Sequence, residues 1–184
     1  MNATSWRRMS GQSLVELAIA TPVVLGLLLG AFNVAVLVSD KVVAGNAVRQ
    51  GARLASEIGG LQTNPSPATT ASVDQDILKN VLAVARAMNY STLRDIYIYQ
   101  ATSPDGQLGN PIPGTAVYNH YLPDGTTGSG PNNFDISLRN QTPPNETSIG
   151  VKLVWTYVPP TGSASFTINL SEYCVMKASP FIPS

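Results

Sequence analysis

The longest stretch of the chain without a charged side chain covers residues 17–39, is predominantly apolar, and predicts a membrane-spanning helix. At about 1.5 Å per residue, this helix would be roughly 34 Å long, enough to cross the ~30 Å hydrocarbon core of a bilayer. A secretory signal has a shorter apolar region, ~7–15 residues, and a cleavage site with small residues after it. The length of the run therefore favours a membrane anchor over a cleaved signal.

The helical pattern continues past the apolar run. Small and apolar residues recur there every three or four positions, which predicts a single stripe on one side of the helix. The stripe consists of Ala44, Val48, Gly51, Ala55 and Ile58. Polar and charged residues fall on the other side, namely Asn46, Arg49, Arg53 and Glu57. With a Gly-Gly stop at 59–60, we expect one helix over residues 12–58, half in lipid and half beyond it.

The rest of the chain predicts a small α+β head. An apolar helical face indicates a helix over 73–89, with a capping box formed by Ser72 and Gln75. Alternation of apolar and polar residues predicts strands over 93–100 and 151–157, and a third strand over 165–170 closes a hairpin near the C-terminus. The expected fold is therefore a long N-terminal transmembrane helix that extends into a head with a second helix and a short antiparallel sheet.

A long segment between the strands, residues 101–148, is rich in Gly, Pro, Asn, Ser and Thr. Within it, Tyr118, Tyr121 and Phe134 are candidates to anchor a short strand or two. Two interpretations of the segment stay open. It is either a variable surface that contacts other subunits, a host or a matrix, or a tolerated insertion with partial disorder.

Composition argues against catalysis and against nucleic-acid binding. The chain of 184 residues has 11 basic and 11 acidic residues and only 12% charged residues, without a basic patch. Cys174 and His120 are single residues of their type, so they predict neither an intrachain disulfide nor a metal site. A membrane-tethered hydrolase needs a nucleophile with a base or paired acids. We therefore expect no enzyme, no catalytic residue, no cofactor, no metal and no small-molecule substrate.

Charges near the predicted span do not decide its orientation by counting. Arg7 and Arg8 precede it, while Lys41, Arg49 and Arg53 follow it closely. The short N-terminal tail with paired arginines is typical of a cytoplasmic stub. The remainder, rich in small polar residues, is typical of a domain outside the cytoplasm. We therefore expect the N-terminus inside and the head outside.

Several residues of the span have two interpretations. Glu16 at its edge is either an interfacial carboxylate or a buried charge that needs a partner. Pro22 removes a backbone donor, and Thr21 is a candidate to satisfy the carbonyl that it frees. Gly26 and Gly30 form a small-xxx-small pair that allows close approach of another helix, although such pairs are also common by chance.

Three motifs carry a family resemblance. The run GQSLVELA over 11–18, followed by ATPVVL over 20–25, resembles the N-terminal segment of TadE-like pseudopilins of tight-adherence (Flp-type) pilus systems. The run AVRQGARLA over 47–55 is similar to the stretch that follows in that family. Residues 151–159 and 170–180 resemble its closing strand pair, although Lys177 stands where arginine is usual and Cys174 is outside the pattern.

The resemblance implies a pilin-like fold and a specific processing history. It implies that a membrane prepilin peptidase cuts between Gly11 and Gln12, and that Glu16 then pairs with the free amine of a neighbouring subunit's first residue. The expected organisation is a cytoplasmic leader over 1–11, the helix over 12–60 and an exocytoplasmic head over 61–184.

The partners that the resemblance implies are the bacterial inner membrane, the peptidase, other pilins or pseudopilins, and the pilus assembly platform. The expected function is that of a pseudopilin or minor pilin in assembly of a tight-adherence pilus or a related secretion apparatus. An alternative stays open, in which the chain is a membrane-anchored binding or adhesion module that is neither cut nor assembled.

Overall fold

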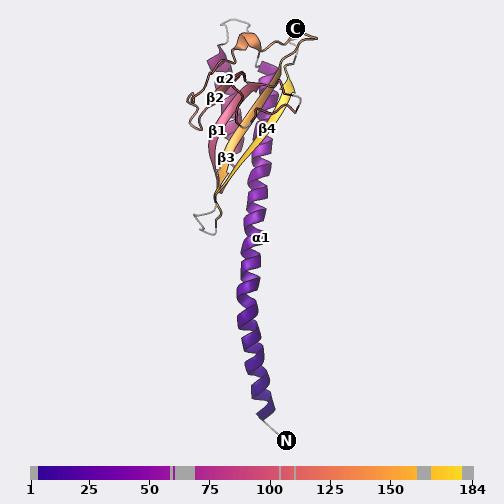
Figure 1. Cartoon of the computed structure of the whole chain (residues 1–184), viewed down its shortest axis with the longest axis vertical. Helices are drawn as coiled ribbons and strands as arrows, with labels where there is room; N and C mark the ends of the chain where they lie inside the picture. Colours follow the sequence, from indigo (N-terminus) through magenta and orange to yellow (C-terminus); the bar gives the residue numbers. More distant parts are fainter. Residues whose placement is uncertain are drawn as a thin grey trace.

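The computed structural model describes residues 4–58, 60, 69–103, 105–109, 111–160 and 167–179, with side chains from residue 11 onward. A single long helix, α1 (Thr4–Ile58), carries the head on its C-terminal part (Figure 1). The head contains helix α2 (Thr70–Ala85), a short 3-10 helix, η1 (Ile136–Leu138), and a four-stranded sheet. The strands are β1 (Ser91–Gln100), β2 (Tyr118–Tyr121), β3 (Ser148–Tyr157) and β4 (Ile168–Lys177). The α+β prediction is confirmed.

The sheet is antiparallel throughout, with strand order β2-β1-β3-β4. Ile98 of β1 lies opposite Val151 of β3, which in turn lies opposite Cys174 of β4. The closing strand pair is thus present. The third strand differs from the predicted 165–170, because β4 begins at Ile168 and continues to Lys177; residues 165 and 166 lie outside the described residues. All ten residues of β3 pair with β4, so β4 is longer than its local sequence pattern predicts.

The two helices cover one face of the sheet, and the hydrophobic core lies between the layers. The stripe predicted on α1 is confirmed, since Ala44, Val48, Gly51 and Ala55 are buried and Ile58 is partly buried. Its small side chains permit close packing. A Cβ atom added at Gly51 would lie 2.4 Å from Cγ2 of Val81 on α2. Alanine and glycine therefore serve here to bring α1 against α2 and β3.

Helix α2 begins earlier than its apolar pattern suggests. Thr69 is the N-cap, and its hydroxyl oxygen accepts a hydrogen bond from the Ser72 backbone N–H at 3.2 Å, while Ser72 Oγ accepts one from the Thr69 N–H at 3.0 Å. The capping box predicted at Ser72 and Gln75 is therefore wrong by one turn. Ser72 stands at the third position of this box, where Glu or Gln is usual, so the sequence pattern did not indicate that the helix begins after Thr69.

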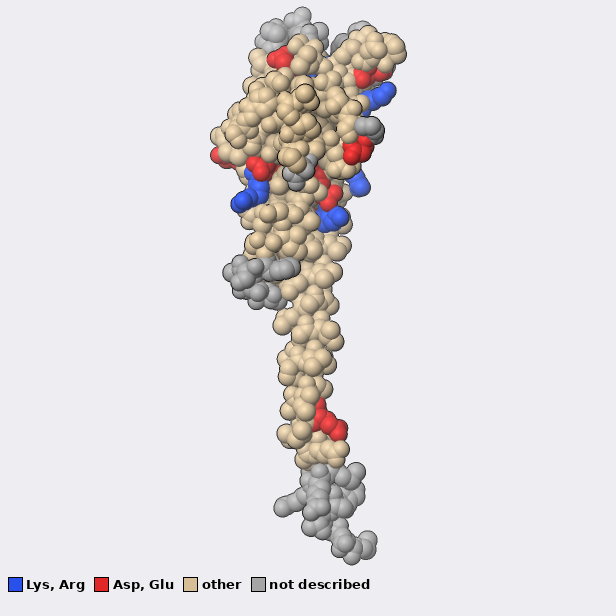
Figure 2. Space-filling view, viewed as in Figure 1, with Lys and Arg blue, Asp and Glu red and all other residues tan. Residues whose placement is uncertain are grey.

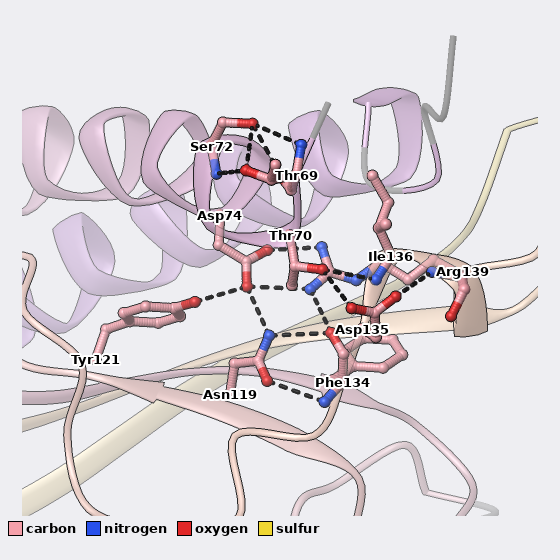
Figure 3. Close-up of polar contacts among 11 residues, drawn as sticks. Thr69, Thr70, Ser72, Asp74, Asn119, Tyr121, Phe134, Asp135, Ile136 and Arg139 are labelled. Carbon is pink, nitrogen blue, oxygen red and sulfur yellow. Dashed lines mark hydrogen bonds and ion pairs between the residues drawn. The ribbon is translucent and has the colours of Figure 1, made fainter. Parts of the chain in front are cut away.

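Several described parts of the segment 101–148 are packed into the head, which favours an ordered part of the fold over a tolerated insertion with partial disorder. Its Arg139 donates two hydrogen bonds to the Asp74 carboxylate of α2, at 2.6 and 3.0 Å, and both side chains are fully buried (Figure 3). Asn119 and Tyr121 donate to the same carboxylate at 2.7 and 2.8 Å. The Arg139 guanidinium also lies 4.6 Å from the Phe134 ring centre.

This buried cluster holds the segment in one arrangement. A buried carboxylate is tolerated when its charge and its lone pairs are matched, and here one guanidinium and two neutral donors match Asp74. Burial, and secondly the nearby Asp74 carboxylate, raise the pKa of Tyr121, so its hydroxyl stays a donor at neutral pH. The short strand predicted around Tyr118 and Tyr121 is present as β2, paired with β1.

Candidate functional site

The exposed half of α1, residues 11–32, is the part of the described chain least explained by folding of the head. All of its side chains are exposed, although most are apolar, and Asn33 is the first that is partly buried. Within α1 an 18-residue window reaches a mean hydropathy of 2.2 with none of its residues buried. No other helix among the described residues is long and apolar enough to span a membrane. This half is roughly 33 Å long, so its length and polarity fit a bilayer.

Glu16 is the only charged residue from Gly11 to the end of the predicted span. It is exposed on the helix surface and accepts a hydrogen bond from Gln12 Nε2 at 3.1 Å, one turn away (Figure 2). A neutral amide donor does not neutralise a carboxylate. In a low-dielectric environment, this carboxylate would therefore gain from a cationic partner.

Pro22 lies inside the continuous helix, as predicted. The hydroxyl of Thr21 donates to the Leu17 carbonyl oxygen at 2.7 Å. Pro22 frees the carbonyl four residues earlier, that of Ala18, so Thr21 does not satisfy it. The expected role of Thr21 is therefore wrong by one position. The freed Ala18 carbonyl is left available on an exposed helix.

Gly26 and Gly30 lie four residues apart on this exposed half. A Cβ atom added at either glycine, or at Gly11, would meet nothing within 4 Å. The two glycines thus leave a shallow, open strip along one side of the helix, suited to close approach of another helix. No element within the described part of the chain lies on that strip.

A polar joint fixes the exposed half to the head. Asp40, 1% exposed, accepts hydrogen bonds from the backbone N–H groups of Asn89 and Tyr90, each at 3.2 Å, and from Ser91 Oγ at 2.6 Å. Sequence reasoning missed this residue. A usable signal existed, because Asp40 stands four residues before Ala44 and therefore on the buried stripe.

A second contact lies seven residues nearer the N-terminus. The Tyr157 hydroxyl at the end of β3 donates to the Asn33 backbone carbonyl at 2.9 Å. The head therefore reaches down to Asn33, inside the predicted span of 17–39. The upper part of that run packs against protein on one side, and residues 11–32 form the part whose side chains are all exposed.

The single histidine and cysteine take ordinary structural positions. His120 Nε2 lies 2.8 Å from Asp95 Oδ1, its Nδ1 lies 2.7 Å from the Ser129 carbonyl oxygen, and its ring stacks on Tyr97 at 4.6 Å. Cys174 is a free thiol, partly buried against the core. Over the described parts of the chain, no three His, Cys, Asp or Glu side chains gather as a metal site would require.

Comparison with family models matches residues 11–53 to the family described as TadE-like protein. The match begins at Gly11 and extends over the exposed half, the joint and part of the buried stripe. Searches of curated proteins and of solved structures returned no match. The TadE-like resemblance of this segment is thereby confirmed, and the segment includes the part of α1 that is long and apolar enough to span a membrane.

Proposed function

We propose that this chain, TadE-like in its N-terminal segment, is a pseudopilin or minor pilin that a prepilin peptidase cuts between Gly11 and Gln12. It then acts in assembly of a tight-adherence (Flp-type) pilus or a related secretion apparatus. The observation that carries this proposal is the coincidence of the TadE-like segment with an exposed apolar half-helix that bears one carboxylate. The head is expected outside the inner membrane and the N-terminus inside.

The surroundings of Gly11 support processing at that position. Nothing of the described chain lies within 4 Å of a Cβ atom built there, so a peptidase has access to the backbone. A glycine inside a helix also lowers helix stability by about 1 kcal/mol relative to alanine. Local opening of the chain, which a peptidase needs before cleavage, is therefore easier at Gly11 than at its neighbours.

The position of Glu16 supports a role in assembly after the cut. Cleavage would create a positively charged amine on Gln12, one helical turn from Glu16. In a bundle of apolar helices the carboxylate of one subunit and the amine of its neighbour would neutralise each other. Because each partner needs the other at a defined depth, such pairing would fix the stagger of adjacent subunits.

A glycine substitution tests the processing step. Gly11→Ala should leave the full-length precursor in the membrane, because the added methyl blocks a glycine-specific cleavage position. Gly26→Ala is the matched control, since its glycine is equally open and lies in the same helix, and it should be cut normally. Intact mass and N-terminal peptide sequencing of the membrane protein give the result. A Gly11→Ala chain that begins at Gln12 would contradict the proposal.

A charge substitution tests the assembly step separately. Glu16→Gln should be cut at the normal position but should be lost from sheared surface fibres and from crosslinks to other pilins. Glu57 is an exposed carboxylate at the far end of α1, and Glu57→Gln is the control. It should be recovered in surface fibres and in crosslinks to other pilins as the parent is. Equal recovery of Glu16→Gln and parent in assembled material would overturn the role of Glu16. A parent chain that begins at Met1 beside an active prepilin peptidase would instead support an uncut, membrane-anchored binding module.

A further inference from the structure

The end of the head nearest the N-terminus of α1 has a composition unlike the rest of its surface. Among the described residues, this end, here called the rim, consists of residues 89–91, between α2 and β1, and residues 157–160, after β3. In Figure 1 the ends of β1 and β3 that lead into it point down along α1. The Tyr157–Asn33 and Asp40–Tyr90 hydrogen bonds place the rim beside α1 just above its exposed half.

The rim exposes two large hydrophobic side chains next to each other. Tyr90 is 41% exposed and Val158 is 42% exposed. The Val158 backbone N–H donates to the Tyr90 carbonyl oxygen at 2.9 Å, so the two residues are neighbours across strand ends. No packing against the described part of the chain covers either side chain. Tyrosine with an apolar neighbour is typical of surfaces at the boundary between lipid and water.

The two segments that form the rim, and the sequence on either side of them, carry no charged residue, and the Asp40 carboxylate that residues 89–91 bind is buried. None occurs between Arg86 and Arg94, or between Lys152 and Glu172. On the face shown in Figure 2, the tan surface below the lowest blue side chains of the head shows no Lys, Arg, Asp or Glu until the red patch near the lower end of the described helix. A surface exposed only to water can carry charged residues at little cost, whereas burying a charge in lipid is costly. The absence of charge therefore favours contact with lipid.

The height of the rim fits a bilayer surface. The exposed half of α1 is roughly 33 Å long, close to the ~30 Å hydrocarbon thickness. If this half spans the membrane, Asn33 lies at the level where acyl chains meet headgroups. Tyr157, bonded to the Asn33 carbonyl, brings the rim to the same level.

We propose that the rim rests in the outer surface of the bilayer that α1 spans, with Tyr90 and Val158 in the interfacial layer. The occupant of this apolar surface is therefore phospholipid. This inference rests on the membrane anchor of the proposed function. Since Asp40 ties residues 89–91 to α1, contact of the rim with lipid would hold the head in one orientation above the membrane.

Spin-label depth measurements on the full chain in phosphatidylethanolamine–phosphatidylglycerol vesicles test the proposal. A nitroxide is attached to single cysteines introduced at Val158, Tyr90, Leu27 or Leu138, in a Cys174→Ser background. Leu138 in η1 is the matched control, because it is an exposed hydrophobic residue of the head, 47% exposed, at the end away from the rim (Figure 1). Frequent collisions of the nitroxide with oxygen indicate that the label lies in lipid. Frequent collisions with a water-soluble nickel chelate indicate that it lies in water.

Labels at Val158 and Tyr90 should collide with the nickel chelate severalfold less often than the label at Leu138. The Leu27 label should report the bilayer interior. If Leu27 reports lipid while Val158 and Tyr90 match Leu138, the rim proposal is overturned and the anchor stands. A Leu27 label exposed to the nickel chelate would overturn both.

A charge placed in the rim gives a second measurement that does not depend on a label at Val158. Val158→Asp should increase collisions of the Tyr90 label with the nickel chelate, because the charged rim leaves the lipid. Leu138→Asp should leave them unchanged. Both substitutions are at exposed positions, so the head should fold normally. An unchanged rate of collision between the Tyr90 label and the nickel chelate in Val158→Asp would contradict contact between the rim and lipid.

Discussion

The two halves of α1 belong to one continuous helix but face different surroundings. From residue 11 to 32 the helix is apolar nearly all round and every side chain is exposed. From Asn33 to Ile58 it has a buried stripe of small residues, and charged side chains on its other side. The first pattern is that of a helix surrounded by lipid or by other helices, and the second that of an amphipathic helix in a water-soluble domain.

This difference separates the roles that substitutions can reveal. From Asn33 to Ile58, here called the upper half, side chains contribute to folding of this chain by itself. The same holds for the head that packs on this half. From residue 11 to 32, here called the lower half, every side chain is exposed, so we expect these residues to contribute only through surroundings outside this chain, such as lipid or another protein. Unfolding of the detergent-solubilised chain should therefore respond to the upper half and ignore the lower half. Four substitutions test this separation, in order of expected effect on the free energy of unfolding.

Arg139→Met should have the largest effect. It leaves the fully buried Asp74 carboxylate without its cation, and removing one partner of a buried pair costs roughly 3–5 kcal/mol. Urea unfolding followed by near-UV circular dichroism measures the loss. Arg94→Met, at an exposed position on β1, should lie within about 0.5 kcal/mol of the parent. An equally small effect of Arg139→Met would mean that the cluster does not hold the head together.

Asp40→Ala should have the next largest effect, at the boundary between the halves. It removes one acceptor from two backbone N–H groups and a serine hydroxyl, and loss of hydrogen bonds to a charged group costs about 1.5–3 kcal/mol. The same urea unfolding experiment measures it. Asp76→Ala is the control, because that carboxylate lies on the surface and pairs only with Lys79 among the ion pairs of the described residues. Equal unfolding midpoints for the two variants would show that the joint contributes nothing.

The sequence predicted the halves of α1 better than it predicted the head's polar contacts. A helical stripe is a local pattern, so Ala44 and Val48 indicated the buried side correctly. Asp74 and Arg139 are 65 residues apart, and neither has a local pattern that indicates its partner. The segment that carries Arg139 was consequently open to interpretation as an insertion. Its composition of turn formers describes backbone geometry and says nothing of burial.

The candidate site residues stand out in the sequence for a different reason, and their roles stay predictions. Gly11, Glu16, Gly26 and Gly30 lie in an apolar run where any polar or small residue stands out, and the family match begins at Gly11. Asp40 was missed because a charge after an apolar run is ordinarily a solvated end of the span. Only the spacing of Asp40 to the buried stripe indicated that it is buried. Its three hydrogen-bond donors belong to residues 89–91, which are distant in sequence.

Gly51→Ala sharpens the comparison within α1, because a control is available in the same half. The added methyl would lie 2.4 Å from Val81 Cγ2, so α1 and α2 must separate or Val81 must move, at a cost of about 1–3 kcal/mol. Gly45→Ala meets nothing within 4 Å and should stabilise the helix by about 0.5–1 kcal/mol. The opposite signs should be visible in urea unfolding. Destabilisation by both would mean that backbone change, and not packing, is responsible.

Gly26→Leu should have the smallest effect on unfolding of the solubilised chain, since its side chain would project from the lower half into open surroundings. The same substitution fills the strip that Gly26 and Gly30 leave open, so it should weaken crosslinking between helices in the native membrane. Leu27→Ile, beside it on the exposed helix, is the control for altered lipid contact. A lowered urea midpoint in Gly26→Leu would show that the halves are coupled, and the separation drawn here would fail. Normal midpoint with normal crosslinking would instead assign helix contact to another side of α1, because the strip would then be free even in the membrane.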